Sequence, residues 1–564
     1  MCKEILFSGF SREFSFKTLE KNLEALSRKQ LKLVQRISWP VDGSHIVFND
    51  DKATYKLHSS EFTLSMPNDK LIDPSEVLEK ESVVFVFGIG LGEQIDFLLE
   101  QLPDRKIMVW DRDPWLVRLF LMQNDYSKSI SAGNLNLFMG ADLINFIPKI
   151  NQYFIVFHPL LKEIYHNETG LISAGIGDKR ILINEGGLLV DDVALALNEF
   201  GYTPFYLNLK RISKEEIEYA IIQFMPSILF SVNYQNGLSE LCKKFSIKLI
   251  CWEIDPSIDL PESLPEKDEN AHVFTYRKKN IDDFVAAGFQ NVHYLPLASN
   301  DKKRYPAVLS EEEKDRYMCP VSFVGSSMAG QADEYMKTLE NHFQSFCGSY
   351  RISYDESVNP LNKILEIQSR DYSNHIIPKL AKTYLGDFLQ YLKENLDEPV
   401  DPVILLAEKA GSEKRLTYLS KLGRYSLRVW GGKGWERLAK DGVRYMGYAG
   451  HKYEINKIYS ASTINIDINR LYQPDMVNMR VFDIMACGGF VIVEYSEDLN
   501  ELFEIDNEVV SFKTLRELLE KVGYYLSNIE RAREIAFRGM MAVRERHTIK
   551  ARVKHMLDVN NETV

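Results

Sequence analysis

Cysteine is scarce in this sequence, and its few occurrences are too far apart to form a metal or disulfide motif. Six cysteines occur among 564 residues, and no C-x-x-C pair is present. The spacing therefore signals neither a zinc site nor a disulfide framework. Scattered thiols are typical of proteins from reducing compartments. We expect a cytoplasmic protein without a bound metal.

The sequence also lacks long hydrophobic runs and an excess of positive charge. No apolar run approaches the roughly 18 residues that a membrane-spanning helix needs. The start, MCKEILFSGFSREFSF, is too polar for the core of a signal peptide. The formal net charge is −12, whereas nucleic-acid binding requires a basic surface that neutralises phosphates. We therefore predict no membrane span and no nucleic-acid partner.

What recurs along the chain is a strand, a turn and an amphipathic helix. This alternation predicts an α/β protein with parallel sheets covered by helices, and the chain is too long for one hydrophobic core. We predict a Rossmann-like N-terminal domain (1–178), two further Rossmann-like domains (179–318 and 319–511) and C-terminal helices that pack back across the domains (512–564). Within the third domain we expect a charged helical stretch near 330–400 and a strand at PVILLAE (402–408).

A glycine-rich turn follows the first predicted strand, in SVVFVFGIGLGEQIDFLLEQL (82–102). Gly88, Gly90 and Gly92 give the backbone room to approach a ligand at a helix N-terminus. Asp111 follows about 20 residues later, where nucleoside-binding Rossmann sheets place a ribose-binding acid. The four residues are therefore ligand candidates. The alternative is that the glycines only permit close packing of strand and helix.

A second candidate site lies in NMRVFDIMACGGFVIVEY (478–495). We predict a short helix that begins near Asn478, a Gly-Gly turn and a buried strand. The positive end of the helix favours a diphosphate, Arg480 can fork onto phosphate oxygens, and Asp483 can accept hydrogen bonds from ribose hydroxyls. The alternative is an exposed salt bridge between Arg480 and Asp483, worth about 0.2–0.5 kcal/mol.

The same segment belongs to a wider resemblance. IYSASTINIDINRLYQPDMVNMRVFDIMACGGFVIVE (458–494) resembles the C-terminal half of CgeB-like glycosyltransferases of the spore maturation protein type. Four other stretches resemble this family in the same order: CWEIDP (251–256), YLPLA (294–298), VSFVGS (321–326) and RHTIKARVKHML (546–557). The resemblance spans about 180–560. Ahead of it, FGIGLGEQ and WDRDP resemble the cores of class I methyltransferases and motility accessory factor proteins.

Two consecutive Rossmann-like domains with final helices describe the GT-B architecture, here preceded by one more Rossmann-like domain. The resemblance implies a UDP-, GDP- or dTDP-sugar donor bound mainly by the C-terminal half, with no further cofactor. The expected donor-binding residues are Gly325, Ser326, Gly432, Lys433, Asn465, Asn478, Arg480 and Asp483. Two features depart from the family pattern. Asp483 stands where glutamate is common, and the turn after FVGSS lacks the basic pair of many GT-B enzymes, which leaves Arg480 and Lys433 to bind phosphate.

The catalytic group is less sharply indicated. Inverting transfer needs a general base near the acceptor hydroxyl, and carboxylates at strand ends of the acceptor half point into the ligand crevice. Asp255 and Glu185 fit this description, although either could instead cap a turn. His451 could lie near the nucleotide or serve as a cap. Neither the sugar nor the stereochemistry follows from these residues.

Three functions from different classes remain open. The leading one is glycosyl transfer to an acceptor such as a flagellin or another surface protein. The second is methyl transfer from S-adenosylmethionine through residues 1–178. The third is a non-catalytic role in which the N-terminal domain recruits a protein partner.

Overall fold

The chain divides into two compact units in the computed structural model. The structure describes residues 14–38, 43–49, 52–57, 60–66, 71–78, 83–255, 263–264, 268–352, 359–396, 400–450 and 453–562. The first unit comprises Met1–Phe274 and Asp282–His293, and the second comprises Thr275–Ile281 and Tyr294–Val564.

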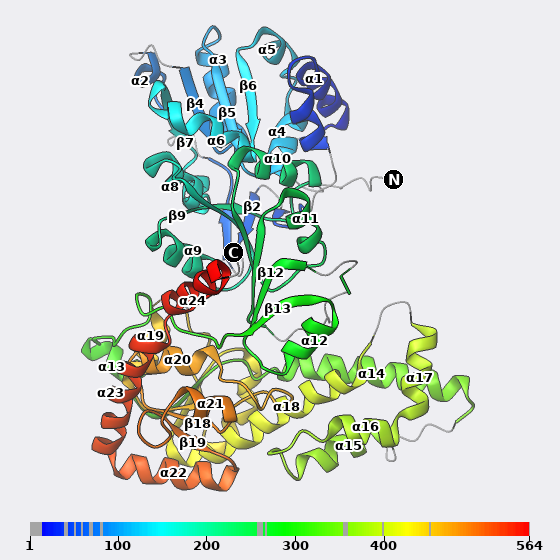
Figure 1. The fold of residues 1–564 in the computed structure, drawn as a ribbon, viewed down its shortest axis with the longest axis vertical. Helices are drawn as coiled ribbons and strands as arrows, with labels where there is room; N and C mark the ends of the chain where they lie inside the picture. The colour runs from blue at the N-terminus through cyan, green and yellow to red at the C-terminus, as the bar shows by residue number, and fades with distance from the viewer. Residues whose placement is uncertain are drawn as a thin grey trace. The chain divides into compact units, whose positions relative to one another are not determined.

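The first unit begins with a parallel sheet in the order β6-β5-β4-β7 (Figure 1). Its strands are continuous apolar runs because helices cover both faces. The strands are β4 (Val83–Phe87), β5 (Ile107–Asp111), β6 (Leu135–Met139) and β7 (Tyr153–Phe157). The helices are α1 (Phe16–Ser38), α2 (Pro74–Leu78), α3 (Glu93–Gln101), α4 (Pro114–Gln123), α5 (Ser127–Ala132), η2 (Gly140–Asp142), α6 (Leu143–Phe146), η3 (Ile147–Gln152), α7 (Pro159–Ile164) and α8 (His166–Ala174).

A small antiparallel sheet lies between α1 and α2 along the chain and was not anticipated from the sequence. It consists of β1 (Ile46–Asn49), β2 (Lys52–Leu57) and β3 (Ser60–Thr63). Its strands are too short to give a clear alternation of polar and apolar residues. Ala53 and Tyr55 on β2 are nevertheless buried, so this sheet contributes one face to the core of the first unit.

A second sheet in the first unit has the order β13-β12-β11-β10-β8-β9. The pairs of β8 with β9 and β10, and of β10 with β11, are parallel. Its strands are β8 (Lys179–Asn184), β9 (Tyr202–Leu207), β10 (Ile228–Val232), β11 (Lys248–Glu253), β12 (Asp268–Thr275) and β13 (Phe289–Tyr294). Its helices are α9 (Val190–Glu199), α10 (Lys214–Phe224), α11 (Leu238–Phe245) and α12 (Asn280–Ala286).

The second unit is built on a six-stranded sheet in the order β16-β15-β14-β17-β18-β19, with every neighbouring pair parallel. This order reverses between β14 and β17, and such a switch point is where doubly wound sheets bind ligands. The strands are β14 (Cys319–Val324), β15 (Leu427–Trp430), β16 (Arg444–Tyr445), β17 (Ser462–Asp467), β18 (Val491–Glu494) and β19 (Val510–Phe512). Flanking helices are α13 (Glu311–Tyr317), η5 (Gly423–Tyr425), η6 (Lys433–Asp441), α19 (Glu454–Ala461), α20 (Met479–Ala486) and α21 (Glu497–Leu502).

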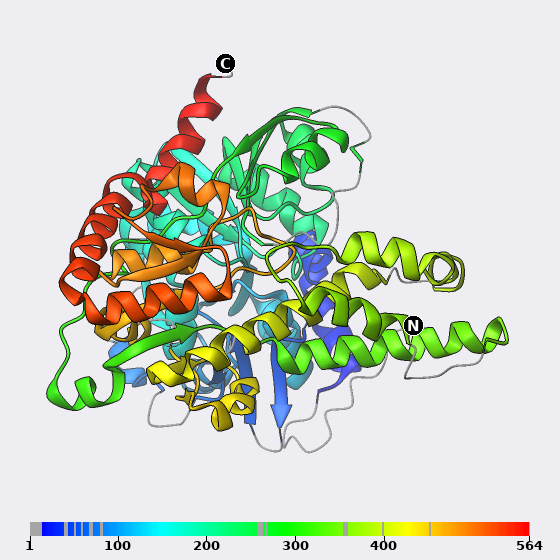
Figure 2. The ribbon, with the colours of Figure 1, turned by 90° about the horizontal axis from the view of Figure 1, so that it is seen from below.

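Five helices connect β14 to β15 in the second unit. They are α14 (Ala329–Ser349), α15 (Pro360–Ser369), α16 (Ile377–Tyr384), α17 (Gly386–Asn395) and α18 (Pro402–Leu422), and the long helices α14 and α18 lie side by side (Figures 1 and 2). The predicted strand at 402–408 is therefore wrong. The Asp401 side chain accepts from the Val403 and Ile404 N–H groups, and Pro402 occupies the first turn. These are strong helix-start signals.

The chain ends in α22 (Leu515–Ser527), α23 (Ile529–Arg546) and α24 (Ile549–Glu562). Arg552 donates to the carbonyls of Pro296 (2.8 Å) and Leu297 (3.2 Å). Ser299 pairs through its backbone with His547 and Ile549. These contacts assign residues 294–318 to the second unit, whereas the sequence placed them before a boundary at 318. Packing of the tail across the domains stays a prediction.

The predicted fold class is confirmed: the protein is α/β, with two successive Rossmann-like sheets of GT-B type after an additional N-terminal one and before a helical tail. The second unit has an apolar core of its own. In the first unit one apolar cluster is shared by the three sheets, and a second cluster covers the other face of the N-terminal parallel sheet. No described helix combines the length and apolarity that crossing a bilayer requires.

Candidate functional site

The side chain of Arg480 lies at the switch point of the second unit. Its Nε donates to Asp467 Oδ1 (2.6 Å) and its Nη1 to the Val324 carbonyl (2.6 Å), so it bridges the carboxyl ends of β17 and β14. The guanidinium also stacks on Phe323, 5.0 Å from the ring centre. Its Nη2 has no hydrogen-bond partner among the described residues. One edge of the fork therefore remains available to a ligand.

Asp483 does not pair with Arg480. Its Oδ1 accepts from the Ser299 hydroxyl (2.6 Å) and its Oδ2 from Arg304 Nε (3.0 Å). The alternative of an exposed salt bridge between Arg480 and Asp483 is therefore wrong. A ribose contact by Asp483 stays a prediction.

The N-terminus of α20 has no side-chain cap. Asn478 occupies the N-cap position, but its amide donates to Asp467 Oδ2 and Asn469 Oδ1, both at 2.8 Å. No acidic residue lies in the first turn. The first N–H groups of the helix therefore keep the positive potential that attracts a phosphate.

Sequence reasoning missed Arg415, which reaches the same switch point from α18. Its Nη1 donates to the Ser326 carbonyl (3.1 Å) and its Nη2 to the Ile468 carbonyl (3.4 Å). The residue is only 7% exposed and has no carboxylate partner among the described residues. Burial, together with the charges of Arg480 and Arg470, lowers the pKa of Arg415 to about 10. An uncompensated buried cation is costly, and an anionic ligand would offset that cost.

The loops after β14 and β15 pack closely and shape the site. Trp435 Nε1 donates to the Gly325 carbonyl (2.8 Å), and a Cβ on Gly431 would lie 2.1 Å from that carbonyl oxygen. Ser326, Gly432 and Lys433 lie at the ends of these loops, and all three are exposed. Lys433 has no ion pair among the described residues, so its ammonium is available to a phosphate.

Gly325 is the residue that makes room for Arg480. A Cβ at this position would lie 2.3 Å from Arg480 Nη1. We expect Gly325→Ala to displace the guanidinium and to weaken nucleotide-sugar binding by about tenfold, measured by calorimetric titration. Gly348→Ala is the matched control, because Gly348 lies on α14 and a methyl group added there would meet no atom within 4 Å apart from its chain neighbours. Equal affinities for the two variants would contradict this role of Gly325.

Asn465 lies inside the sheet. It is 1% exposed, its amide donates to the carbonyls of Tyr459 (3.2 Å) and Phe490 (3.1 Å), and its Oδ1 accepts from Ser322 (2.8 Å). These bonds hold β14, β17 and the start of β18 together. The sequence predicted that Asn465 faces the cleft, and its contacts instead favour a supporting role. Donor binding by Asn465 stays a prediction.

The two candidate bases follow strands of the second sheet of the first unit. Asp255 is exposed and accepts from Asn233 Nδ2 (3.0 Å), two residues after β11 ends. Glu185 follows β8 directly and pairs with Arg112 Nη2 (3.1 Å). Because β10 separates β8 from β11, the ends of these two strands are about 10 Å apart. Of the two carboxylates, only that of Glu185 forms an ion pair with a described residue, so that of Asp255 is more readily available as a base. His451 lies outside the described residues.

In the N-terminal sheet, protein atoms already occupy the groups expected to bind a ligand. Asp111 is fully buried and accepts from the Ile89 N–H (2.7 Å), the Asp113 N–H (2.8 Å) and the Tyr165 hydroxyl (2.7 Å). Burial raises the pKa of Asp111 to about 7. His158, which follows β7, packs against the glycine turn. This geometry favours the packing alternative, and ligand binding here stays a prediction.

The glycines of that turn are needed for its packing. Gly90 has φ = 59°, and a Cβ there would lie 2.3 Å from His158 Nε2; Gly88 and Gly92 also have positive φ and close neighbours. We expect Gly90→Ala to lower the free energy of unfolding by about 1–3 kcal/mol, measured by chemical denaturation. Gly170→Ala, in open space on α8, should be neutral or stabilising. A neutral Gly90→Ala would contradict the packing role.

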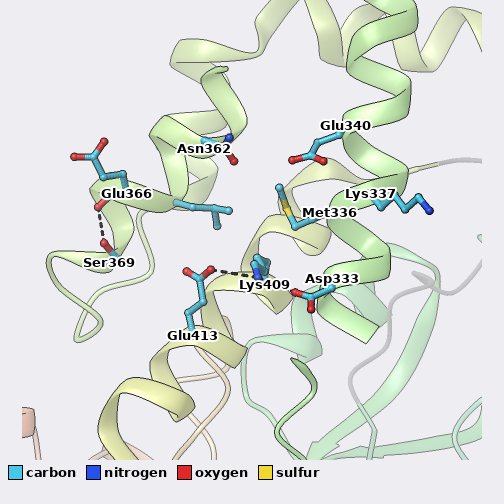
Figure 3. Close-up of a pocket in the computed structure, with 10 residues that line it drawn as sticks. Asp333, Met336, Lys337, Glu340, Asn362, Glu366, Ser369, Lys409 and Glu413 are labelled. Atoms are coloured by element: carbon cyan, nitrogen blue, oxygen red, sulfur yellow. Dashed lines mark hydrogen bonds and ion pairs between the residues drawn. The ribbon is translucent and has the colours of Figure 1, made fainter. Parts of the chain in front are cut away.

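A separate pocket lies on the helices between β14 and β15 (Figure 3). Its lining includes the carboxylates of Asp333, Glu340, Glu366 and Glu413, and Lys409 pairs with Asp333 (2.9 Å) and Glu413 (3.4 Å). Because acidic groups dominate the lining, this pocket is unsuited to a diphosphate. Within the described ranges, no cluster of three or more His, Cys, Asp or Glu side chains has metal-binding geometry.

Part of this arrangement is similar to known proteins. Residues 413–558, from α18 to α24, match the family described as Glycosyl transferase-like. An uncharacterised protein of Aquifex aeolicus (strain VF5) is 22% identical over 303 residues, which cover 52% of this chain and 70% of that protein.

Two solved structures are also similar. The glycosyltransferase from Rickettsia africae ESF-5 has a TM-score of 0.42 at 12% identity, covering 69% of this chain and 99% of that one. Anabaena Alr3699/HepE in complex with UDP-glucose has a TM-score of 0.38 at 10% identity, covering 68% and 99%. The family match includes Arg415, Arg480 and Asp483. The C-terminal half of the chain therefore carries a glycosyltransferase-like domain, as the sequence predicted.

Proposed function

We propose that the protein transfers a sugar from a UDP-, GDP- or dTDP-sugar to an acceptor hydroxyl, and that the donor binds at the switch point between β14 and β17. The Glycosyl transferase-like match over 413–558 supports the reaction class. Anabaena Alr3699/HepE, which has been solved with UDP-glucose, offers an example of such a donor. No metal is part of the proposal.

One observation carries this assignment: Arg415, which donates to carbonyls that follow β14 and β17, is buried without a carboxylate partner among the described residues. The N-terminus of α20 has no side-chain cap. Arg415 donates to the Ser326 carbonyl and Arg480 to the Val324 carbonyl, so both contact the segment at the end of β14. The Nη2 of Arg480 is available to a ligand. Among the carboxylates at this point, Asp467 pairs with Arg480 and Glu408 pairs with Arg470 (2.9 Å). The site therefore has a surplus of positive charge, which a diphosphate would neutralise.

The remaining donor contacts follow from this placement. Lys433 and Ser326 would approach the phosphates from the loops, and Asp483 would accept from the ribose. The general base is proposed to be Asp255, with Glu185 as the second candidate, because both follow strands of the acceptor half.

A panel titration tests the proposal. The full-length protein is titrated calorimetrically with UDP-, GDP-, dTDP- and CMP-sugars, and release of the nucleotide (a nucleoside diphosphate, or CMP from a CMP-sugar) is followed by chromatography. We expect one nucleotide class to bind at millimolar concentration or tighter and to be hydrolysed slowly without acceptor. Absence of both binding and turnover with every donor would overturn the proposal.

The finer features of the proposal concern subtype, acceptor and compartment. The motifs between 180 and 560 support a CgeB-like subtype, and the likeness of FGIGLGEQ to motility accessory factors supports a protein acceptor such as a flagellin. Cys242, Cys251, Cys319, Cys347 and Cys487 are free and buried, which fits a reducing cytoplasm. Glycan analysis of co-expressed flagellin would test the acceptor.

Methyl transfer is the less favoured function. Asp111 already receives three hydrogen bonds from the protein, and His158 packs against Gly90. We expect no heat of binding when S-adenosylmethionine is titrated into the full-length protein. Saturable binding that Asp111→Asn abolishes would favour the methyltransferase.

A further inference from the structure

The first unit contains a pocket to which the proposed glycosyl transfer assigns no ligand, although Glu185, the second candidate base, is among its lining residues. It opens where residues after β5, β8 and β9 meet β2 of the small antiparallel sheet. Five residues line both of its adjoining chambers: Tyr55, Arg112, Glu185, Asn208 and Arg211. The larger chamber has a volume of about 320 Å³, which is the size of a small-molecule site.

The placement of this pocket follows from sheet topology. Arg112 comes directly after β5, Glu185 directly after β8, and Asn208 directly after β9. The carboxyl ends of parallel strands are where α/β sheets bind ligands. Here strand ends from two different parallel sheets line one cavity, and Tyr55 of β2 lines it as well.

One cation of the lining has no ion-pair partner. The carboxylates of the lining pair with basic side chains, Glu185 with Arg112 (3.1 Å), Glu216 with Arg36 (2.8 Å) and Asp113 with His45, and Arg36 also pairs with Asp142 (2.6 Å). Arg112 also contacts Glu168 (3.3 Å). Arg211, in contrast, has no ion-pair partner among the described residues. One guanidinium therefore faces the pocket without a counter-ion.

Tyr55 supplies a second polar group that lacks a partner. The residue is 3% exposed, and its ring packs edge-on against His45 with 5.1 Å between centres. Its hydroxyl makes no hydrogen bond to any described residue. Burial raises the pKa of Tyr55, so the hydroxyl stays a neutral donor at physiological pH. A hydroxyl donor on the pocket lining without a protein acceptor is available to a bound anion.

We propose that this pocket binds the anionic head group of a small organic phosphate or carboxylate. The oxyanion lies between the Arg211 guanidinium and the Tyr55 hydroxyl, and the Asn208 amide donates to it from the end of β9. Both head groups present the oxygen pair that an arginine fork recognises. Glu185, held by Arg112, forms the opposite wall and accepts from hydroxyl groups of the ligand.

Titration of the full-length protein with simple anions tests this site. Inorganic phosphate and acetate are titrated separately into the parent protein, Arg211→Gln and Tyr55→Phe, by calorimetry at constant ionic strength. We expect Arg211→Gln to weaken binding of the preferred anion by about tenfold to a hundredfold, and Tyr55→Phe to weaken it less. The tighter of the two anions identifies the head group.

Lys210→Gln is the matched control, because it removes the same charge from an exposed neighbour that does not line the pocket. It should bind the anion like the parent. Nucleotide-sugar titration of Arg211→Gln should also match the parent, which separates this site from the proposed donor site. Equal anion affinity in Arg211→Gln and Lys210→Gln, or no binding of either anion to the parent, would overturn the proposal.

Discussion

Arg480→Ala is expected to weaken nucleotide-sugar binding by about tenfold to a hundredfold. The variant removes a charge-assisted contact to the diphosphate worth about 1.5–3 kcal/mol. It also leaves Asp467, which is fully buried, without its cation. We therefore expect a loss of stability as well, of about 3–5 kcal/mol. From the sequence alone, Arg480 is a partly exposed residue whose removal would hardly change stability. The ion pair with buried Asp467 is the reason for the larger expected loss.

A double variant separates the two roles of Arg480. In Asp467→Asn/Arg480→Gln both charges of the pair are gone, so much of the stability should return. Donor affinity should stay low, because the fork that binds the phosphates is still missing. Both quantities can be measured on the same samples, by denaturant unfolding and by calorimetric titration well below the melting temperature. If the double variant binds donor like the parent, Arg480 only neutralises Asp467.

Arg480→Lys adds a test of geometry. It keeps the charge beside Asp467 but cannot reproduce the planar fork. We expect it to recover more stability than affinity. A variant that recovers both equally would indicate that charge alone matters at this position.

Arg415→Met is expected to weaken donor binding by about tenfold to a hundredfold without lowering stability. In the free protein the Arg415 guanidinium donates to the carbonyls of Ser326 and Ile468, and burial lowers its pKa to about 10. Replacing an uncompensated buried charge by an apolar side chain of similar length relieves a desolvation cost. Only the donor complex loses a favourable interaction, because only there is the charge neutralised.

The measurement compares Arg415→Met with Arg424→Met. Arg424 is exposed just beyond the end of α18, so the second variant changes the net charge equally but away from the switch point. We expect Arg424→Met to bind nucleotide sugar like the parent. A destabilised Arg415→Met with unchanged donor affinity would make Arg415 a structural residue and would remove the observation on which the donor site rests.

The sequence by itself determined the α/β class, the series of three Rossmann-like sheets and the short helix between Asn478 and the Gly-Gly turn. These features are local. A run of β-formers, a glycine turn and an amphipathic segment each report their secondary structure through nearest neighbours along the chain. The helix found in place of the predicted strand at 402–408 also has a local signal. Asp401 caps its N-terminus and Pro402 occupies its first turn, and these two residues outweigh the apolar composition that had suggested a strand.

Only the tertiary structure decided which groups meet. Arg480 pairs with Asp467 and not with Asp483, Arg415 reaches the switch point from a distant helix, and His158 packs into the N-terminal glycine turn. Tyr55 and Arg211 line one pocket although β2 and the end of β9 are far apart along the chain. The spacing of apolar residues shows which face of a helix or strand is buried. The element that packs against that face depends on the order of the strands in the sheet. For that reason the lack of a counter-ion at Arg415 and at Arg211 became visible only in three dimensions.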